Sequence, residues 1–122
     1  MILNWNGAEH LRRFLPSVVA SAPEGVEVVV ADNGSTDESL ALLEREFPTV
    51  GRIALDRNYG FAGGYNRALE RVDAEYFILL NSDVETPAGW VEPLLKALDE
   101  DESVAAVAPN LLSWSHSARF EY

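Results

Sequence analysis

Strand-like and helix-like segments alternate along the whole chain, and this alternation limits the fold more than any other feature. Short apolar runs that suit buried strands are separated by stretches whose apolar residues recur at helical spacing. Alternating strands and helices build a mostly parallel sheet with helices on both faces. The sequence therefore predicts an α/β fold with three layers, α/β/α, around a Rossmann-like sheet. The expected strands are residues 1–3, 26–31, 50–55, 77–80 and 104–108. The expected helices cover 8–20, a stretch that opens after Ser35 and reaches about 47, a stretch ending near 72, and 87–98, with Thr86 as the N-cap of the last.

Length, composition and charge exclude several classes of protein. The chain has 122 residues, 48% of them hydrophobic, which is enough for the core of a single domain over residues 1–122. It has no cysteine, so disulfides and thiolate metal sites are excluded. A formal net charge of −11 opposes binding to nucleic acid or to an anionic membrane. With neither a membrane-spanning run nor a basic signal start, we expect a cytoplasmic protein.

An apolar run ends abruptly in a cluster of oxygen ligands at Asn81 and Asp83. Residues 78–80 are apolar, and Asn81 and Asp83 are two positions apart, so in an extended chain their side chains point the same way. An amide and a carboxylate oxygen together suit Mg²⁺ or Mn²⁺, which also accept water and phosphate oxygens. The alternative is that both residues simply close a turn, since Asn and Asp are common there.

Two other predicted strand ends carry candidate binding residues. Trp5 and Asn6 follow the first apolar run, where the indole ring could stack on a planar ligand or instead pack against the next helix. Asp32 ends the second run, and the competing interpretation is that it only forms the turn at the start of the next helix. Ser35 and Glu38 have capping-box spacing, and Asp37 and Ser35 can already supply that turn. This redundancy favours a ligand role for Asp32.

A glycine-rich stretch, residues 56–66, is expected to form a loop that leads into a helix. Glycine lets the backbone approach a ligand closely, and amides at a helix start can receive phosphate. Its spacing matches neither a dinucleotide-binding nor a Walker motif, so a surface turn is the competing interpretation.

The candidate residues fall at the carboxyl ends of strands in one predicted parallel sheet. Ligand sites in such sheets collect at this edge, near the point where the strand order reverses. With the first and fourth strands adjacent there, we expect Trp5, Asp32 and Asp83 to line one crevice.

Four motifs follow one another along the chain: ILNWNG (2–7), VADNGSTD (30–37), NYGFAGGYN (58–66) and LLNSD (79–83). Together they resemble family 2 glycosyltransferases of the GT-A fold, in particular the rhamnosyltransferase-like branch. The resemblance implies that Trp5 packs on a nucleotide base, that Asp32 reads its edge, and that Asp83 carries the divalent metal, Mg or Mn. Asn81 takes the place of the first acid of an Asp-x-Asp motif. The full set of donor-binding residues implied is Asn4, Trp5, Asn6, Asp32, Asn58, Gly63, Gly64, Asn66 and Asn81.

The resemblance further implies an inverting, metal-dependent transfer from a nucleotide-diphosphate sugar to a glycan acceptor in cell-surface polysaccharide synthesis. The general base of such an enzyme is expected downstream of Tyr122, so we expect a truncated fold: a donor-binding part whose acceptor side is absent and which is inactive alone. In that case Trp114, Phe120 and Tyr122 would form exposed apolar surface and favour a homodimer. The full-length protein would then lie in the cytoplasm, with a peripheral place at the inner face of the membrane as a further expectation.

Two other functions stay open from the sequence. One is a non-catalytic nucleotide-binding or interaction domain on the same fold. The other is a nucleotidyltransferase, which would normally show a basic, glycine-rich loop soon after the first strand; Glu9 and His10 occupy that region instead.

Overall fold

The computed structural model describes residues 1–114 and 120 of the chain. Contacts within it group into two compact units, one over Met1–Ala88 and a second that begins at Gly89. The first unit holds the sheet and three helices, and the second holds one helix. In chain order the elements are β1 (Ile2–Asn4), α1 (Ala8–Ser21), β2 (Val29–Asp32), α2 (Ser39–Glu46), β3 (Gly51–Ala54), α3 (Gly60–Leu69), β4 (Leu80–Asn81) and α4 (Val91–Asp99).

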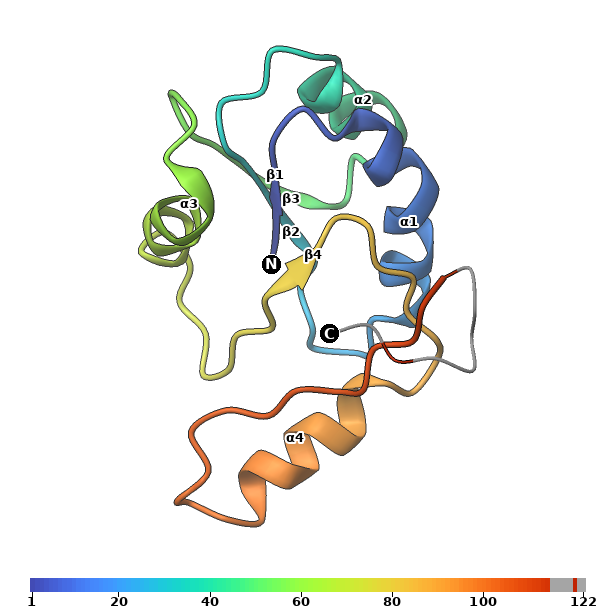
Figure 1. Ribbon diagram of the computed structural model, residues 1–122, viewed down its shortest axis with the longest axis vertical. Helices are drawn as coiled ribbons and strands as arrows, with labels where there is room; N and C mark the ends of the chain where they lie inside the picture. Colours follow the sequence, from blue (N-terminus) through green and yellow to red (C-terminus); the bar gives the residue numbers. More distant parts are fainter. Residues whose placement is uncertain (115–119, 121–122) are drawn as a thin grey trace. The chain divides into compact units, whose positions relative to one another are not determined.

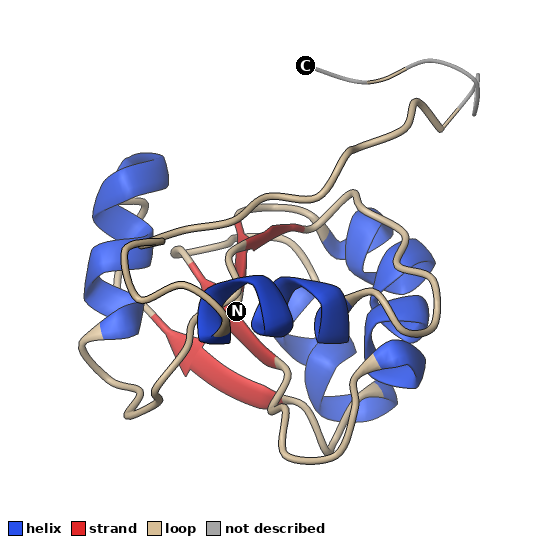
Figure 2. Cartoon of the chain, turned by 90° about the horizontal axis from the view of Figure 1, so that it is seen from below, coloured by secondary structure: helices blue, strands red, loops and turns tan. Residues whose placement is uncertain are grey.

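The four strands form one parallel sheet in the order β3-β2-β1-β4. Figure 1 shows α3 on one side of this sheet and α1 and α2 on the other, and in Figure 2 the strands run between the helices. The predicted three-layer α/β/α fold with a parallel sheet is therefore confirmed. The chain steps from β1 to β2 and β3, and β4 is then added on the opposite side of β1, so the strand order reverses between β1 and β4, as the sequence predicts.

Aliphatic side chains between the sheet and α1 and α2 form the core. Among the apolar residues that recur at helical spacing in α1, Leu11 and Leu15 are fully buried, whereas Val19 is 38% exposed. Burying a side chain of this size contributes about 1.5–3 kcal/mol. The core cluster consists of Ile2, Ala8, Leu11, Leu15, Val18, Val30, Leu42, Leu43 and Val50.

On the other face of the sheet, the Tyr65 side chain of α3 joins β1 to β4. Its hydroxyl donates to the carbonyl oxygen of Leu80 at 3.0 Å and accepts from the amide of Leu3 at 3.4 Å. Tyr65 is 3% exposed, and burial raises the pKa of its phenol, so the hydroxyl stays protonated and able to donate. The sequence analysis did not single out this residue.

The fourth strand is shorter and more exposed than predicted. The sequence indicates a strand over residues 77–80 with both faces covered, but β4 comprises only Leu80 and Asn81, and Phe77 and Leu79 are 44% and 53% exposed. Within the described residues β4 pairs with β1 alone and forms the edge of the sheet, so its outer side has no neighbouring strand.

Two predictions near the end of the chain are wrong. Residues 104–108 form no strand, and α4 begins at Val91 and not at Pro87. A strand needs a neighbour that accepts its backbone hydrogen bonds, and the described residues offer none to 104–108. Thr86, the expected helix cap, is buried, and its hydroxyl lies 2.8 Å from that of Ser21 in α1.

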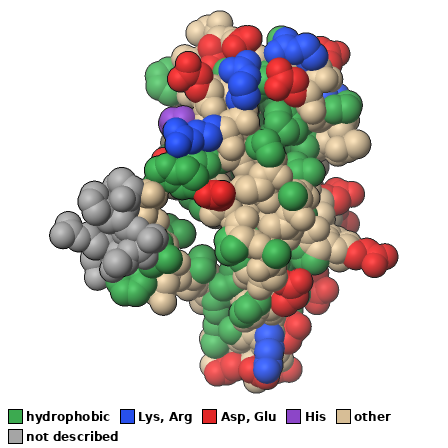
Figure 3. All heavy atoms as spheres, turned by 90° about the vertical axis from the view of Figure 1, so that its right-hand side faces the viewer, with side chains coloured by type: hydrophobic (Ala, Val, Ile, Leu, Met, Phe, Trp, Pro, Cys, Tyr) green, Lys and Arg blue, Asp and Glu red, His purple; other side chains and the backbone are tan. Residues whose placement is uncertain are grey.

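Acidic side chains dominate the charge of the surface, as the composition requires. On the face drawn in Figure 3 they are scattered among hydrophobic side chains and a few basic ones. Trp114 and Phe120, two of the predicted exposed aromatic residues, are 59% and 53% exposed, and Tyr122 lies outside the described residues. No helix in the described part of the chain is long and apolar enough to cross a bilayer.

Replacing Tyr65 by Phe should lower the free energy of unfolding by about 1 kcal/mol. The change keeps the ring but leaves the Leu80 carbonyl and the Leu3 amide without this partner. Urea unfolding followed by circular dichroism measures the difference. An unfolding free energy equal to that of the unchanged chain would show that the hydroxyl does not help to hold β4.

Candidate functional site

The carboxyl ends of the strands lie together at one edge of the sheet. Asn4, the last residue of β1, is level with Asp32, the last of β2, while Leu3 is level with Asn81 at the end of β4. Trp5, Asn33 and Ser82 therefore all leave the sheet at the same edge, as the sequence predicts. This edge, next to the point where the strand order reverses, is the candidate site.

A buried amide–carboxylate contact joins the ends of β1 and β2. Asn4 Nδ2 donates to Asp32 Oδ2 at 3.0 Å and to Ser35 Oγ at 3.3 Å, and the Ser35 amide donates to Asp32 Oδ1 at 2.9 Å. Asn4 and Asp32 are 0% and 1% exposed. Both Asp32 oxygens thus have protein donors, which gives Asp32 a role in the framework; its contact with a base edge stays a prediction.

Asn6 connects this cluster to the loop that follows β2. Its backbone has φ = 51°, in the left-handed region that Asn tolerates better than most residues. The side-chain Oδ1 of Asn6 accepts from the backbone amide of Thr36 at 2.8 Å, and the backbone amide of Asn6 donates to Ser35 Oγ at 2.8 Å. Asn6 is nevertheless exposed, so it can also meet a ligand.

The predicted capping box is wrong. Ser35 binds Asn4 and Asn6, and the N-cap of α2 is Glu38, whose side chain makes no cap hydrogen bond. Asp37 supplies the cap contacts: its Oδ1 accepts from the Ser39 amide at 3.0 Å and its Oδ2 from the Ala8 amide at 3.1 Å. One carboxylate thereby receives amide donors at the starts of both α1 and α2.

Asn33, which the sequence analysis did not select, joins the end of β2 to the start of α3. Its Oδ1 accepts from the Tyr59 amide at 3.0 Å, and its Nδ2 donates to Asn58 Oδ1 at 3.1 Å and to the Gly60 carbonyl at 3.0 Å. Asn33 is 2% exposed and Asn58 is exposed. The place of Asn33 directly after Asp32 in the motif is the signal that could have identified this residue.

The glycine-rich stretch is partly helical. Gly60, Gly63 and Gly64 all lie in the first turns of α3, so the loop predicted over 56–66 ends earlier than expected. A Cβ at Gly64 would lie 2.8 Å from Leu3 Cδ1 and 2.9 Å from Asn33 Nδ2, so the absence of a side chain lets α3 pack closely on β1 and β2. Gly63 is only partly buried. Contacts of Gly63 and Gly64 with a donor stay predictions.

Two arginines gather around Tyr59 at the start of α3. The guanidinium carbon of Arg67 lies 3.8 Å from the centre of the Tyr59 ring, and that of Arg57 lies 4.9 Å from it. The Tyr59 hydroxyl donates to Asp56 Oδ1 at 2.7 Å, and this bond, helped by the charges of Arg57 and Arg67, lowers the pKa of Asp56. These two arginines were not among the residues predicted from the sequence, although both border the glycine-rich motif.

The predicted ligand contacts that are open to solvent are Trp5 (57% exposed), Asn6, Asn58, Asn66, Asn81 and Asp83. The structure places the Asn81 and Asp83 side chains at or just beyond the end of β4. No group of three or more His, Cys, Asp or Glu side chains in the described residues is arranged to hold a metal. Asp83 and Asn81 therefore fit a cation only if further oxygens come from a bound ligand and water, which suits Mg²⁺ or Mn²⁺.

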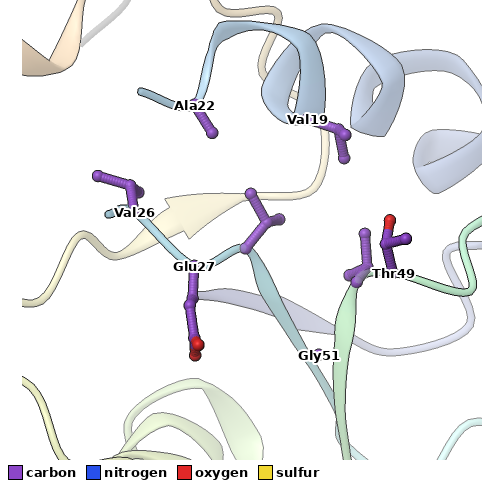
Figure 4. Close-up of a pocket in the computed structure, with 8 residues that line it drawn as sticks. Val19, Ala22, Val26, Glu27, Thr49 and Gly51 are labelled. Carbon is purple, nitrogen blue, oxygen red and sulfur yellow. The ribbon is translucent and has the colours of Figure 1, made fainter. Parts of the chain in front are cut away.

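A pocket of about 400 Å³ lies at the opposite edge of the sheet, beside the amino ends of β2 and β3 (Figure 4). Its lining is mainly aliphatic, with one acid: Val19, Ala22, Val26, Glu27, Val28, Thr49, Val50 and Gly51. None of these side chains is cationic, so the pocket offers no positive charge to an anionic ligand. The carboxyl edge, where the polar motifs meet, is therefore the better candidate.

Comparisons with known proteins show the family of the chain. Residues 1–113 match the model of the family described as glycosyl transferase family 2. An N-acetylglucosaminyl-diphospho-decaprenol L-rhamnosyltransferase of Mycobacterium tuberculosis is 28% identical over 118 residues, which cover 88% of this chain and 38% of that protein. An uncharacterized glycosyltransferase of Bacillus subtilis is 31% identical over 122 residues, covering 97% of this chain and 30% of the relative.

Solved structures give the same result for the fold. S. aureus TarS in complex with UDP has a TM-score of 0.69 and 25% identity, covering 84% of this chain and 32% of that one. TarS in complex with UDP-GlcNAc has a TM-score of 0.67 at 24% identity. The chain spans only 30–38% of the length of these relatives and solved structures.

The two adjacent glycines of α3 should respond differently to alanine. Gly64→Ala should lower the free energy of unfolding by about 1–3 kcal/mol, because the new methyl group meets Leu3 and Asn33 in a packed layer. Gly63→Ala is the matched control: its Cβ would lie 3.3 Å from Tyr59 Cβ, and alanine favours a helix, so stability should change little. Thermal unfolding of both variants tests this, and equal losses would contradict close packing at Gly64.

Proposed function

Because the chain belongs to glycosyl transferase family 2, we propose that it forms the part of a glycosyltransferase that binds the nucleotide-diphosphate sugar. The observation that supports this proposal is that β1 and β4 are parallel neighbours where the strand order reverses, so that Trp5, Asn81 and Asp83 follow strands that end at the same edge of the sheet. The UDP and UDP-GlcNAc complexes of TarS support a donor of this class.

The exposed Trp5 ring supplies the binding surface for the nucleotide base. It is 57% exposed at the end of β1, where the neighbouring backbone is fixed by the contacts of Asn4 and Asn6. A large flat ring on a rigid support can stack on a base without first becoming ordered. The buried Asp32 maintains this support through its bond to Asn4, and contact with the base edge is a further proposed role.

Asp83 and Asn81 would hold a Mg²⁺ or Mn²⁺ ion together with the donor diphosphate. Both are exposed at the same edge and carry oxygen ligands, but they are too few to hold a cation without the diphosphate. When bound, the ion neutralises the negative charge that grows on the leaving diphosphate as the glycosidic bond breaks. This local charge would let a chain of net charge −11 bind an anionic donor, and Arg57 and Arg67 add two positive charges near the same edge.

We further propose that transfer inverts the anomeric centre and needs an acceptor-side part with a general base. That base takes the proton of the acceptor hydroxyl, and we place it downstream of Tyr122 in the full-length protein. Residues 1–122 would then bind the donor without transferring its sugar. The rhamnosyltransferase relative and a related teichoic acid poly(glycerol phosphate) polymerase of Staphylococcus epidermidis support an acceptor among cell-surface glycans.

Asp83→Ala should abolish the Mn²⁺-dependent part of the affinity for uridine or thymidine diphosphate. The fold should be kept, since removing an exposed carboxylate creates no core cavity. Glu85→Ala is the matched control, because Glu85 is an exposed acid two positions further on and should be neutral. Calorimetric titrations with Mn²⁺ and with EDTA measure both effects.

Equal affinities for the Asp83→Ala variant and the unchanged chain would remove Asp83 from the metal site. A chain that binds neither nucleoside diphosphate, with or without Mn²⁺, would contradict donor binding itself.

A further inference from the structure

The segment that follows β4 carries the proposed metal ligand, and it is fixed at both of its ends. We call residues 82–88 the β4 exit segment. At its start, Leu80 of β4 pairs with Ile2 of β1, and its carbonyl accepts from Tyr65 at 3.0 Å. At its far end, Thr86 is 7% exposed against α1. In Figure 1 this segment runs from β4 toward α1.

Two hydroxyl groups on successive turns of α1 hold Thr86. Its backbone amide donates to Ser17 Oγ at 3.2 Å, and its Oγ1 lies 2.8 Å from Ser21 Oγ. Ser17 Oγ in turn donates to the carbonyl oxygen of Phe14 at 2.8 Å, so its lone pairs are directed to the Thr86 amide. Both the main chain and the side chain of Thr86 are therefore bound to the same face of one helix.

Asp83 itself has no such support. It is exposed, and its carboxylate makes no hydrogen bond or ion pair within the described part of the chain. Its place is set by the backbone on either side, between Leu80 in the sheet and Thr86 on α1. A metal-binding carboxylate whose backbone has so few anchors loses its position when one anchor is removed. An anchored segment is already ordered, so it loses less entropy when the diphosphate and the metal bind.

Helix α1, which binds Thr86, also contacts the loop that follows β2 at the carboxyl edge of the sheet. The amide of Ala8, the first residue of α1, donates to Asp37 Oδ2 at 3.1 Å in the loop after β2. A Cβ built on Gly7 would lie 3.8 Å from Ser82 Oγ, so the exit segment passes close to the beginning of this helix as well. α1 thus fixes the loops after β2 and β4 relative to each other.

We propose that Thr86, held by Ser17 and Ser21, is a positioning residue that keeps Asp83 in place for the metal and diphosphate. The inference rests on the proposed function and deepens it. In this proposal the Thr86 hydroxyl affects ligand binding indirectly, because it holds Asp83 in place. The sequence pattern Thr-Pro by itself indicates only a helix cap.

The test compares two disruptive variants with a rescue and a stability control. Thr86→Val removes the hydroxyl but keeps the branched shape, and the double variant Ser17→Ala with Thr86→Val also removes the acceptor of the Thr86 amide. Thr86→Ser restores the hydroxyl. Val50→Ala lowers stability from the core near the opposite edge of the sheet and leaves the exit segment intact. Each is titrated with uridine and thymidine diphosphate in Mn²⁺ and in EDTA, and amide hydrogen exchange is followed at residues 82–85.

The double variant should bind nucleoside diphosphate about 10- to 100-fold more weakly in Mn²⁺, with no comparable loss in EDTA. Its amides at 82–85 should exchange faster in the ligand-free chain. Thr86→Val should fall between it and the unchanged chain, and Thr86→Ser should restore both readouts. Val50→Ala should lower the melting temperature while keeping the Mn²⁺-dependent affinity.

Two results would overturn the positioning role while leaving the proposed function in place. One is an unchanged Mn²⁺-dependent affinity in the double variant. The other is a loss that simply follows melting temperature, so that Val50→Ala loses as much affinity as Thr86→Val. If the unchanged chain fails to bind either diphosphate in Mn²⁺, the proposed function fails, and the role of Thr86 in binding fails with it.

Discussion

The hydrogen bond between the buried Asn4 amide and the buried Asp32 carboxylate, 3.0 Å long, is the interaction on which the candidate site depends. A carboxylate that is 1% exposed must be satisfied by protein donors, because leaving it without them would cost several kcal/mol. Asn4 and the Ser35 amide provide these donors, and they can do so only if β1 and β2 pair in the observed register. That register brings Trp5 and the loop after β2 to the same edge.

The alternation of apolar runs and amphipathic stretches was enough to predict the parallel sheet, its helical layers and the edge where polar motifs meet. Local pattern failed where a side chain had a tertiary partner. Ser35 fits a capping box, but Asn4 and Asn6 bind it instead. Thr86 fits a helix cap, but α1 binds it. The strand predicted over 77–80 is mostly absent because β4 lies at the edge of the described sheet, and an apolar run does not reveal which strands will be neighbours.

The residues of the candidate site also differ in how well the sequence predicts them. Exposed residues at strand ends, such as Trp5 and Asp83, could be selected from motif and position, because a strand end fixes where the next side chains leave the sheet. The buried supports, Asn33 and Tyr65, were not selected. The motif marks Asn33 only through its place after Asp32, and the contacts of both residues join segments that are 26 and 62 residues apart in sequence. The proposed function also has an electrostatic requirement: in a chain of net charge −11, a diphosphate binds only where a cation or an arginine offsets that charge.

The central claim is that a nucleoside diphosphate and a divalent ion bind together at the carboxyl edge, between the ends of β1 and β4. Paramagnetic Mn²⁺ broadens NMR signals close to it, so the measurement is an amide spectrum of the ¹⁵N-labelled chain with uridine or thymidine diphosphate and substoichiometric Mn²⁺. The account predicts selective broadening of the amides of residues 5–7 and 82–85. Broadening centred on residues 26–28 and 49–51, which line the pocket at the opposite edge, or broadening spread evenly over the acidic surface, would contradict it.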